Sequence, residues 1–198
     1  MQPFHDPELR YRSAPRLETE RLVLRDLELH DLDYFRTIFR DEETTRYIGG
    51  VNDDENLWRK MMTGKAFWPL TGTGMWAAER KDDGTTVGHL GFFDFLRPIE
   101  PSISGEPEMG WIFAPAVHGQ GLASEACQAA LDWFNDVFGR REIHALISPG
   151  NVASMRLAER LGFQRSLAGF ACQPLAVNGR REDPAHFRFA ANRRLNGT

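Results

Sequence analysis

The sequence predicts one mixed α/β domain, of the α+β type, in which a central sheet is flanked by helices. Short segments with apolar residues at every second position predict strands, and segments with apolar residues at helical spacing predict helices. The two kinds of segment follow the order β, α, α, three or four β, α, β, α and then β, without an internal repeat or linker. A chain of 198 residues can bury one sizeable core.

The first half begins with residues 1–16, which carry three prolines and predict a flexible lead-in to a domain over residues 17–198. Leu22 and Leu24 alternate with Arg21, Val23 and Arg25 in a predicted strand. A helix is expected near residues 31–41, begun by His30 or Asp31. A second helix is expected after Asp53 or Asp54, running through Met62, with an uncertain end at Gly64.

The middle of the chain reads as strands. Residues 75–80 and 86–95 predict two strands joined at Asp83-Gly84, which is a hairpin signal. A loop over Pro98–Pro107 leads to a strand at residues 108–113, which Pro115 stops.

The last third alternates helices and strands. A helix is predicted from Leu122 to Phe138 and closed by Gly139. A strand at residues 142–147 precedes a helix that Asn151 opens and Gly162 ends. In the tail, Asn178-Gly179 predicts a hairpin turn whose second strand is residues 185–190.

Bulk properties exclude several classes of protein. The formal net charge is −4, and no basic stripe suggests a nucleic-acid partner. No apolar run reaches the length of a membrane span, and the first residues hold no signal-peptide core, so a cytoplasmic location is expected. Cys127 and Cys172 lie too far apart for a zinc motif, so no metal site and no disulfide framework are predicted.

The most informative segment is the glycine-rich turn between the strand at 108–113 and the helix at 122–138. The first amides of a helix have no internal acceptors, and the helix dipole favours an anion at that end. Gly119 and Gly121 allow the backbone to approach an oxygen closely. The turn therefore predicts a pyrophosphate site, against the simpler interpretation of an ordinary glycine-containing connection.

Two other phosphate motifs fit poorly. A P-loop needs Lys and then Ser or Thr after its last glycine, where Leu122 and Ala123 stand. A dinucleotide fingerprint needs a third glycine, where Ser124 stands, and an acidic residue at the end of the next strand, whereas Glu142 begins it. A nucleotide-dependent oxidoreductase remains the weaker alternative.

The segment HGQGLASEA, residues 118–126, resembles the acetyl-CoA pyrophosphate loop of the GNAT acetyltransferases, whose pattern is (Gln/Arg)-x-x-Gly-x-(Gly/Ala). His118 takes the first place, which departs from the usual Gln or Arg and leaves open whether this side chain touches phosphate. Residues 151–163, NVASMRLAERLGF, are similar to the second coenzyme-facing segment of that family. Together with LETERLVLRDL, the likeness covers residues 17–190 and points to the Rim-type branch, the ribosomal-protein alanine N-acetyltransferases.

The resemblance implies a GNAT fold with a mixed, mostly antiparallel sheet, in which strands 108–113 and 142–147 splay apart to admit acetyl-CoA. It implies an N-acetyltransferase that moves an acetyl group to a primary amine by direct attack in a ternary complex. The amine is a protein N-terminus or a small molecule, and the chain is a monomer or a homodimer. A coenzyme A-binding module without catalysis is the alternative. The residues that the resemblance assigns to the coenzyme are Ile112, Phe113, His118, Gly119, Gln120, Gly121, Leu122, Ala123, Ser124, Asn151 and Ser154.

Two residues are candidate catalysts. Glu108 begins the strand that leads to the coenzyme and is the candidate base, against the alternatives of a water chain or of a solvated carboxylate at a strand start. Ser154 is the candidate proton donor to the leaving thiolate, against a helix hydroxyl that bonds its own preceding turn. Tyr47, Trp58 and Trp68 are either amine-pocket or core residues.

Overall fold

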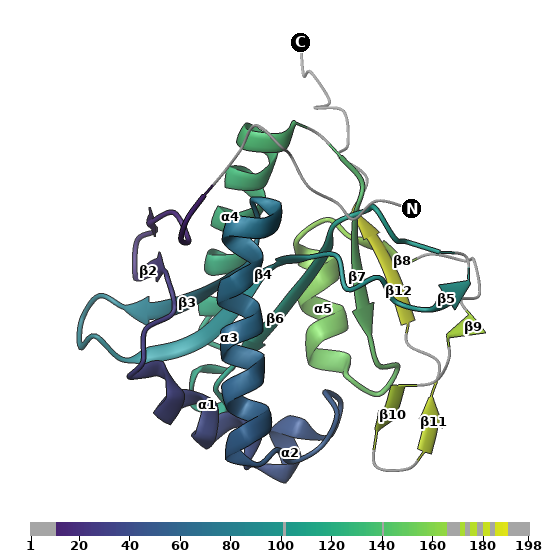
Figure 1. Ribbon diagram of the computed structural model, residues 1–198, viewed down its shortest axis with the longest axis horizontal. Helices are drawn as coiled ribbons and strands as arrows, with labels where there is room; N and C mark the ends of the chain where they lie inside the picture. Colours follow the sequence, from purple (N-terminus) through teal and green to yellow (C-terminus); the bar gives the residue numbers. More distant parts are fainter. Residues whose placement is uncertain are drawn as a thin grey trace.

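The computed structural model describes residues 11–100, 102–139 and 141–165, and beyond them the backbone of four short strands (Figure 1). Its helices are α1 (Asp31–Phe39), α2 (Glu42–Thr45), α3 (Asp54–Thr71), α4 (Leu122–Phe138) and α5 (Val152–Arg160), with a 3₁₀ turn at Pro115–Val117. Its strands are β1 (Leu17–Glu18), β2 (Leu22–Arg25), β3 (Met75–Arg80), β4 (Thr86–Phe93), β5 (Ile99–Glu100), β6 (Glu108–Phe113), β7 (Ile143–Ile147), β8 (Gln164–Arg165), β9 (Ala171–Cys172), β10 (Leu175–Val177), β11 (Arg180–Glu182) and β12 (Ala185–Phe189).

One sheet organises the molecule. Its strand order is β1-β2-β3-β4-β6-β7-β12-β8. Every pair is antiparallel except β6 and β7, which are parallel. The predicted mixed, mostly antiparallel sheet is therefore confirmed.

Helices cover both faces of this sheet, with α3 in front and α4 and α5 behind in Figure 1. Neighbouring residues of a strand point to opposite faces. Accordingly Ala77 packs with α1 and α3, in a cluster with Phe35 and Met61, whereas Trp76 packs in the larger cluster that includes Phe134 of α4. The sheet thus separates two apolar cores.

The parallel pair β6 and β7 is joined only at one end. A single bridge pairs Glu108 with His144, and the His144 amide donates to the Pro107 carbonyl at 2.9 Å. Beyond this bridge, the described residues show no pairing between the two strands, so a gap opens along the rest of β6. The splay expected between residues 108–113 and 142–147 is present.

Helix α3 is longer than predicted, because it passes through Gly64 and Pro69 and ends at Gly72 in the left-handed conformation. A Cβ at Gly64 would come within 2.8 Å of the Met75 side chain, so the glycine allows α3 to lie close to β3. Pro69 lies in the last turn of α3, where it has no backbone donor for the Lys65 carbonyl, so one bond of the helix is missing there. The short helix α2 was not predicted.

The tail corrects the predicted hairpin. β10 pairs with β11, so the second strand of this hairpin is Arg180–Glu182, and the expected strand at 185–190 instead corresponds to β12, which joins the main sheet beside β7. The turn residues Asn178-Gly179 lie outside the described residues.

The predicted lead-in is described only from Tyr11 onward. The Tyr11 ring lies 6.0 Å from that of Trp68 and 5.7 Å from that of Trp133, and Ala14 is buried. The Trp76 indole donates to the Pro15 carbonyl at 2.7 Å. Residues 11–16 therefore pack on the core, and Met1–Arg10 lie outside the described residues.

Candidate active site

The glycine-rich turn has the geometry of an anion site. Gly119 and Gly121 have φ of 77° and 79°, which residues with a Cβ rarely adopt, and Gly121 caps α4 without a side-chain bond. The amide of Glu125 donates to the Gly121 carbonyl, but no acceptor among the described residues takes the amides of Gly121, Leu122, Ala123 and Ser124. Four donors therefore remain available at the positive end of a 17-residue helix.

Two side chains of the loop bond backbone carbonyls that precede them. His118 Nε2 lies 3.1 Å from the Phe113 carbonyl, and Gln120 Nε2 donates to the Ala116 carbonyl at 2.9 Å. These contacts engage one atom of each side chain within the loop itself. The backbone amides of residues 121–124 remain unpaired among the described residues beside these contacts.

Arg21 connects the turn to the strand region before β2. Its Nη1 donates to the Gln120 carbonyl at 2.9 Å, and its Nε donates to Glu125 Oε2 at 2.7 Å. Thr19 Oγ1 donates to the other oxygen of Glu125 at 2.5 Å. Glu125 lies in the first turn of α4, so this contact holds the start of the helix in place.

The register of β6 decides which amides face the gap. The Ala114 amide donates to the Val87 carbonyl, so Ala114 and Val87 form a hydrogen-bonded pair. Such pairs occur at every second residue of an antiparallel ladder, so Ile112–His89 and Gly110–Gly91 are hydrogen-bonded pairs as well. The backbone of Ile112 is thus turned to β4, whereas the amides of Trp111 and Phe113 face the gap beside β7. Side chains alternate as well, so Glu108 and Ile112 point to the α1 and α3 face.

A cavity of about 500 Å³ lies where the gap meets the α1 and α3 face. Glu108 and Ile112 of β6, Ser148 after β7, and Asn151 and Ser154 of the α5 segment line it. Residues 118–124 do not line this cavity. The predicted site residues therefore form two groups, one at the start of α4 and one around the cavity, with the exposed edge of β6 between them.

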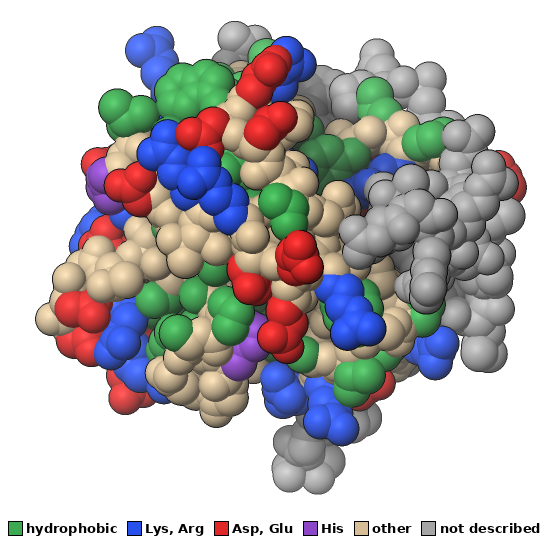
Figure 2. Space-filling model, turned by 90° about the horizontal axis from the view of Figure 1, so that it is seen from below, with side chains coloured by type: hydrophobic (Ala, Val, Ile, Leu, Met, Phe, Trp, Pro, Cys, Tyr) green, Lys and Arg blue, Asp and Glu red, His purple; other side chains and the backbone are tan. Residues whose placement is uncertain are grey.

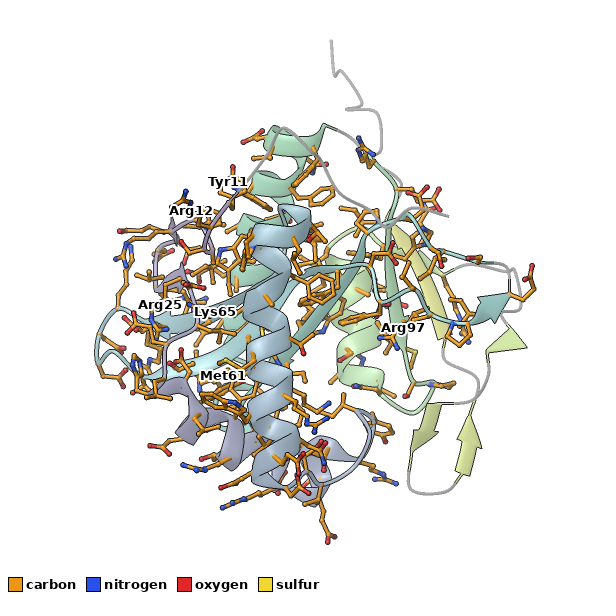
Figure 3. The ribbon with its side chains drawn as sticks, in the orientation of Figure 1. Tyr11, Arg12, Arg25, Met61, Lys65 and Arg97 are labelled. Atoms are coloured by element: carbon orange, nitrogen blue, oxygen red, sulfur yellow. The ribbon has the colours of Figure 1, made fainter. Side chains whose placement is uncertain are left out.

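Glu108 is buried and held by Arg97. Its oxygens accept from Arg97 Nε at 2.5 Å and from Nη2 at 2.8 Å, in a bidentate pair. Figure 3 shows Arg97 on the same side of α3 as α5. Each carboxylate oxygen can accept more than one hydrogen bond, so lone pairs remain for a substrate.

An irregular turn after β4 presents Arg97. Leu96 has φ of 48°, an uncommon conformation for a residue with a branched side chain. Asp94 stabilises this turn by accepting from the amides of Leu96 at 2.9 Å and Gly105 at 2.8 Å. Sequence reasoning missed Arg97, because its partner Glu108 is separated from it by a loop that no periodicity describes.

Asn151 and Ser154 lie at the start of α5. Asn151 Oδ1 accepts from the Ser154 amide at 3.1 Å, which confirms Asn151 as the N-cap. Among the described residues, neither the Ser154 hydroxyl nor the Asn151 amide nitrogen has a hydrogen-bond partner. Both groups are therefore available to a ligand in the cavity.

Other titratable groups are less suited to catalysis. His89 lies in the cavity wall, where burial and then the charge of Lys60 lower its pKa to about 3 despite the opposing effect of Asp31, so it is neutral near pH 7. Cys127 is fully buried, and burial raises its pKa, so it remains a protonated thiol. Among the described residues, no cluster of His, Cys, Asp or Glu fits a metal ion, and no helix is long and apolar enough to cross a membrane.

The three aromatic candidates have different positions. Tyr47 lines the cavity. Trp68 of α3 is fully buried, with its ring against that of Trp76 of β3. Trp58 is 43% exposed and does not line the cavity. Only Tyr47 is placed to contact a substrate.

Comparison with known proteins gives a consistent result. Residues 21–164 match the family model described as acetyltransferase (GNAT) domain. The chain is 33% identical to the uncharacterized protein YkkB of Bacillus subtilis over 154 residues, which is 76% of this chain and 86% of that protein. An acetyltransferase from Agrobacterium tumefaciens superposes with a TM-score of 0.75 at 27% identity, covering 93% of this chain and 99% of the other.

A Rim-type enzyme has the same fold. The ribosomal-protein-S5-alanine acetyltransferase of Vibrio fischeri has a TM-score of 0.71 and covers 89% of this chain and 97% of its own, but at 17% identity this shows the fold alone. The match to the family model spans most of the chain and contains both the glycine-rich turn and the α5 segment. The chain therefore belongs to the GNAT family of N-acetyltransferases, which use acetyl-CoA.

Proposed function

We propose that this protein transfers an acetyl group from acetyl-CoA to a primary amine by direct attack, with both substrates bound together. The observation that carries the proposal is the gap beside β6, which leads to a cavity lined by both Glu108 and Ser154. In this proposal the two groups lie on either side of the thioester carbonyl.

The coenzyme would lie along the exposed edge of β6. The amides of residues 121–124 would bind the diphosphate, and the amides of Trp111 and Phe113 would pair with the amide groups of the pantetheine arm, as an added strand does. Asn151 would donate its unused amide hydrogens near the thioester. Ile112 would contact the acetyl end through its side chain, since its backbone is paired with β4.

Each remaining chemical task has a candidate group. Acetyl-CoA supplies an acetyl group activated as a thioester. Glu108 would take a proton from the incoming ammonium through lone pairs that Arg97 does not engage. A backbone amide of β6 facing the gap would stabilise the oxyanion, and Ser154 would protonate the leaving thiolate. Cys127 takes no part, because it is buried as a neutral thiol.

The motifs favour the Rim-type branch for this chain, with the segments 17–27 and 118–126 as support.

The size of the acceptor is a separate question. A protein N-terminus needs an open groove over the splayed strands. In this chain Tyr47, in the segment before α3, contacts the loop after β7 at the cavity wall: Ser148 Oγ donates to the Tyr47 carbonyl at 3.2 Å, and a Cβ at Gly150 would lie 2.8 Å from the Tyr47 ring. This contact restricts one side of the cavity and favours a small amine over a polypeptide.

The test of the base is a pH profile of Glu108→Gln. With an amine that the wild type acetylates, we expect kcat/KM at pH 7 to fall about 100-fold, because Gln cannot accept the proton. We expect most of this loss to disappear above the pKa of the amine, which is about 10 for an alkyl amine, since the free amine then needs no base.

Glu106→Gln is the matched control, since Glu106 is exposed and precedes Glu108 by two residues. We expect less than a twofold effect. A loss in Glu108→Gln that stays constant across pH would contradict the base and indicate that Glu108 only positions Arg97. A protein that binds acetyl-CoA but acetylates no amine would support the noncatalytic coenzyme-binding module instead.

A further inference from the structure

The charges around the cavity are unevenly balanced. Among the described residues, its charged lining consists of three cations, Arg59, Lys60 and Arg97, and one carboxylate, Glu108. His89 adds no charge near pH 7, because its pKa is lowered to about 3. The local excess of positive charge contrasts with the net charge of −4 for the whole chain.

Two of the three cations have acidic partners. Arg97 forms the bidentate pair with Glu108, and Arg59 Nη2 contacts Glu55 Oε1 at 2.6 Å one turn earlier on α3. Lys60 has no carboxylate partner among the described residues. It is the cation of the cavity whose charge nothing in the described part of the chain compensates.

Lys60 lines the cavity and is exposed to solvent. Its Nζ is 5.4 Å from the centre of the Phe39 ring, and partial desolvation lowers its pKa. Basic side chains on the outer surface of α1 and α3 are placed differently: Arg36 and Arg40 both contact Asp54, at 3.0 Å and 2.5 Å. Figure 2, which views this end of the molecule, shows acidic and basic side chains interspersed.

Aromatic rings form an apolar part of the cavity lining, beside the uncharged polar residues Asn52, Asn56 and Thr63. Phe35 and Phe39 of α1 belong to this part, together with Phe67, Phe93 and Phe95, whose rings pack against one another with centroids 4.9–5.7 Å apart. About 500 Å³ must hold the acetyl end of the coenzyme as well as the acceptor. The acceptor that fits is small and has an apolar body.

We propose that the acceptor is a small amine that carries one carboxylate, and that Lys60 binds this carboxylate. The proposal rests on the acetyl-transfer function proposed above and deepens it. One lysine matches one negative charge, whereas a phosphate dianion would call for more donors. Polyamines are disfavoured, because a second ammonium would meet Lys60 instead of a carboxylate.

The reaction balances with these groups. The amine nitrogen forms a bond to the acetyl carbon while the carbon–sulfur bond breaks. Of the two protons that the ammonium loses, one passes to Glu108 and then to solvent, and the thiolate gains one from Ser154, which is restored by the second. The products are the N-acetylated amino carboxylate and coenzyme A as a free thiol.

The experiment compares matched amines. Amino acids with aromatic and aliphatic side chains, and ω-amino acids of increasing length, are assayed beside the same amines without the carboxylate, the corresponding carboxamides, and spermidine. We expect at least one carboxylate-bearing amine to exceed its decarboxylated and amidated partners about 10-fold or more in kcat/KM, which is the effect of one ion pair of about 1.4 kcal/mol.

Variants of Lys60 test the assignment of the carboxylate site. Lys60→Met should remove this preference, mainly through a higher KM for the carboxylate-bearing amine, and leave neutral amines within about twofold. Lys60→Arg should retain the preference, and Lys60→Glu should shift it toward diamines. Arg160→Met removes an exposed cation at the far end of α5 and should change none of these values.

Binding measurements keep failures distinguishable. Calorimetry of each amine with the protein–coenzyme A complex reports acceptor affinity without turnover, and the same preference and the same Lys60 dependence are expected there. Equal or tighter binding of neutral amines or spermidine, or a preference that survives Lys60→Met, would overturn this inference and leave acetyl transfer intact. Carboxylate-dependent binding without any acetylation would instead contradict the proposed function.

Discussion

Residues that line the cavity differ from polar residues elsewhere in how their hydrogen-bonding groups are used. On the outer surface, Arg36 and Arg40 contact the acidic neighbour Asp54. Around the cavity, the Ser154 hydroxyl and the Lys60 ammonium have no partner among the described residues. Both groups line the same cavity, Lys60 from α3 and Ser154 from α5, so a ligand bound there has two unpaired polar groups to contact.

Ser154→Ala tests the proton donor. If Ser154 protonates the leaving thiolate, kcat should fall about 10- to 100-fold while the affinity for acetyl-CoA changes less than threefold, because the hydroxyl acts mainly in the transition state. Steady-state kinetics and calorimetry measure the two quantities. Thr37→Ala, which removes an exposed helix hydroxyl that bonds the Asp33 carbonyl, should leave both unchanged. Full turnover in Ser154→Ala would exclude the assignment.

Single residues also show what the sequence could indicate. Asn151 was expected to cap α5 because an Asn before an apolar helical pattern is a local signal, and its side chain does so. Arg97 and Lys60 gave no such signal. Their importance comes from Glu108, Phe39 and His89, which reach them only through tertiary packing.

Among the secondary-structure elements, α4 has a start that several contacts hold in place. The residues before it need two left-handed conformations, and Arg21 and Glu125 tie the turn to the β1–β2 region. This arrangement orients the amides before any ligand binds. A preorganised donor set binds more tightly because less conformational freedom is lost on binding.

Gly121→Ala tests this element. Its left-handed conformation disfavours a Cβ by about 1–2 kcal/mol, so the turn should relax and its amides lose their alignment. The added Cβ itself would meet only Arg21 Nη2 at 3.5 Å, an ordinary contact. We expect the dissociation constant for coenzyme A to rise at least fivefold in calorimetry.

Gly84→Ala is the matched control for Gly121→Ala. Gly84 has φ of 71° in the turn between β3 and β4, and a Cβ there would meet no atom within 4 Å. It should cost similar stability without changing coenzyme affinity. If both variants bound coenzyme A like the wild type, the diphosphate could not lie on the amides of residues 121–124.

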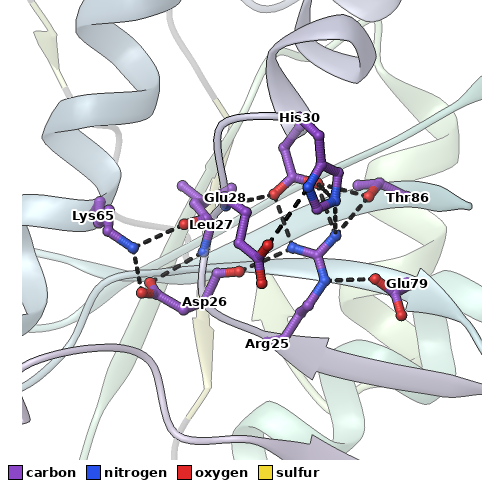
Figure 4. Close-up of polar contacts among 9 residues, drawn as sticks. Arg25, Asp26, Leu27, Glu28, His30, Lys65, Glu79 and Thr86 are labelled. Atoms are coloured by element: carbon purple, nitrogen blue, oxygen red, sulfur yellow. Dashed lines mark hydrogen bonds and ion pairs between the residues drawn. The ribbon is translucent and has the colours of Figure 1, made fainter. Parts of the chain in front are cut away.

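At the scale of the whole molecule, a buried ion network joins the early helix to the sheet (Figure 4). Arg25 of β2 contacts both oxygens of Asp31 at 2.8 Å and 3.0 Å, and its Nε contacts Glu79 of β3 at 2.6 Å. Thr86 of β4 donates to Asp31 at 2.7 Å. The network thereby fixes α1, and with it the Phe35 and Phe39 wall of the cavity.

Asp31→Asn should destabilise the fold strongly, because it leaves the buried Arg25 without its bidentate partner. Loss of one member of a buried pair costs about 3–5 kcal/mol, which urea unfolding would measure. Asp33→Asn, two residues later on the same helix, removes the charge of a side chain that is 85% exposed, and it should cost less than about 1 kcal/mol. Equal effects of the two substitutions would argue against the network.

The same pair gives a pH dependence. Burial opposes ionisation of Asp31, but hydrogen bonds from Arg25, the Glu28 amide and Thr86 outweigh it and lower its pKa. A carboxylate with a lowered folded-state pKa stabilises the fold above its unfolded value of about 4 and loses this contribution as the pH falls through the folded value. Unfolding free energy should therefore decline below pH 4 in the wild type, with a shallower decline in Asp31→Asn.

The sequence by itself determined the local elements and the glycine-rich turn before α4. Periodicity gave the strand at 108–113 and the helix at 122–138 with the observed bounds, since helix caps, glycines and apolar spacing act between near neighbours. The tertiary structure alone decided the extent of α3 past Gly64, the place of β12 in the sheet, and the pairing of Arg97 with Glu108. The physical reason is that these features depend on contacts between residues distant in the chain, which override local propensity once the two cores form.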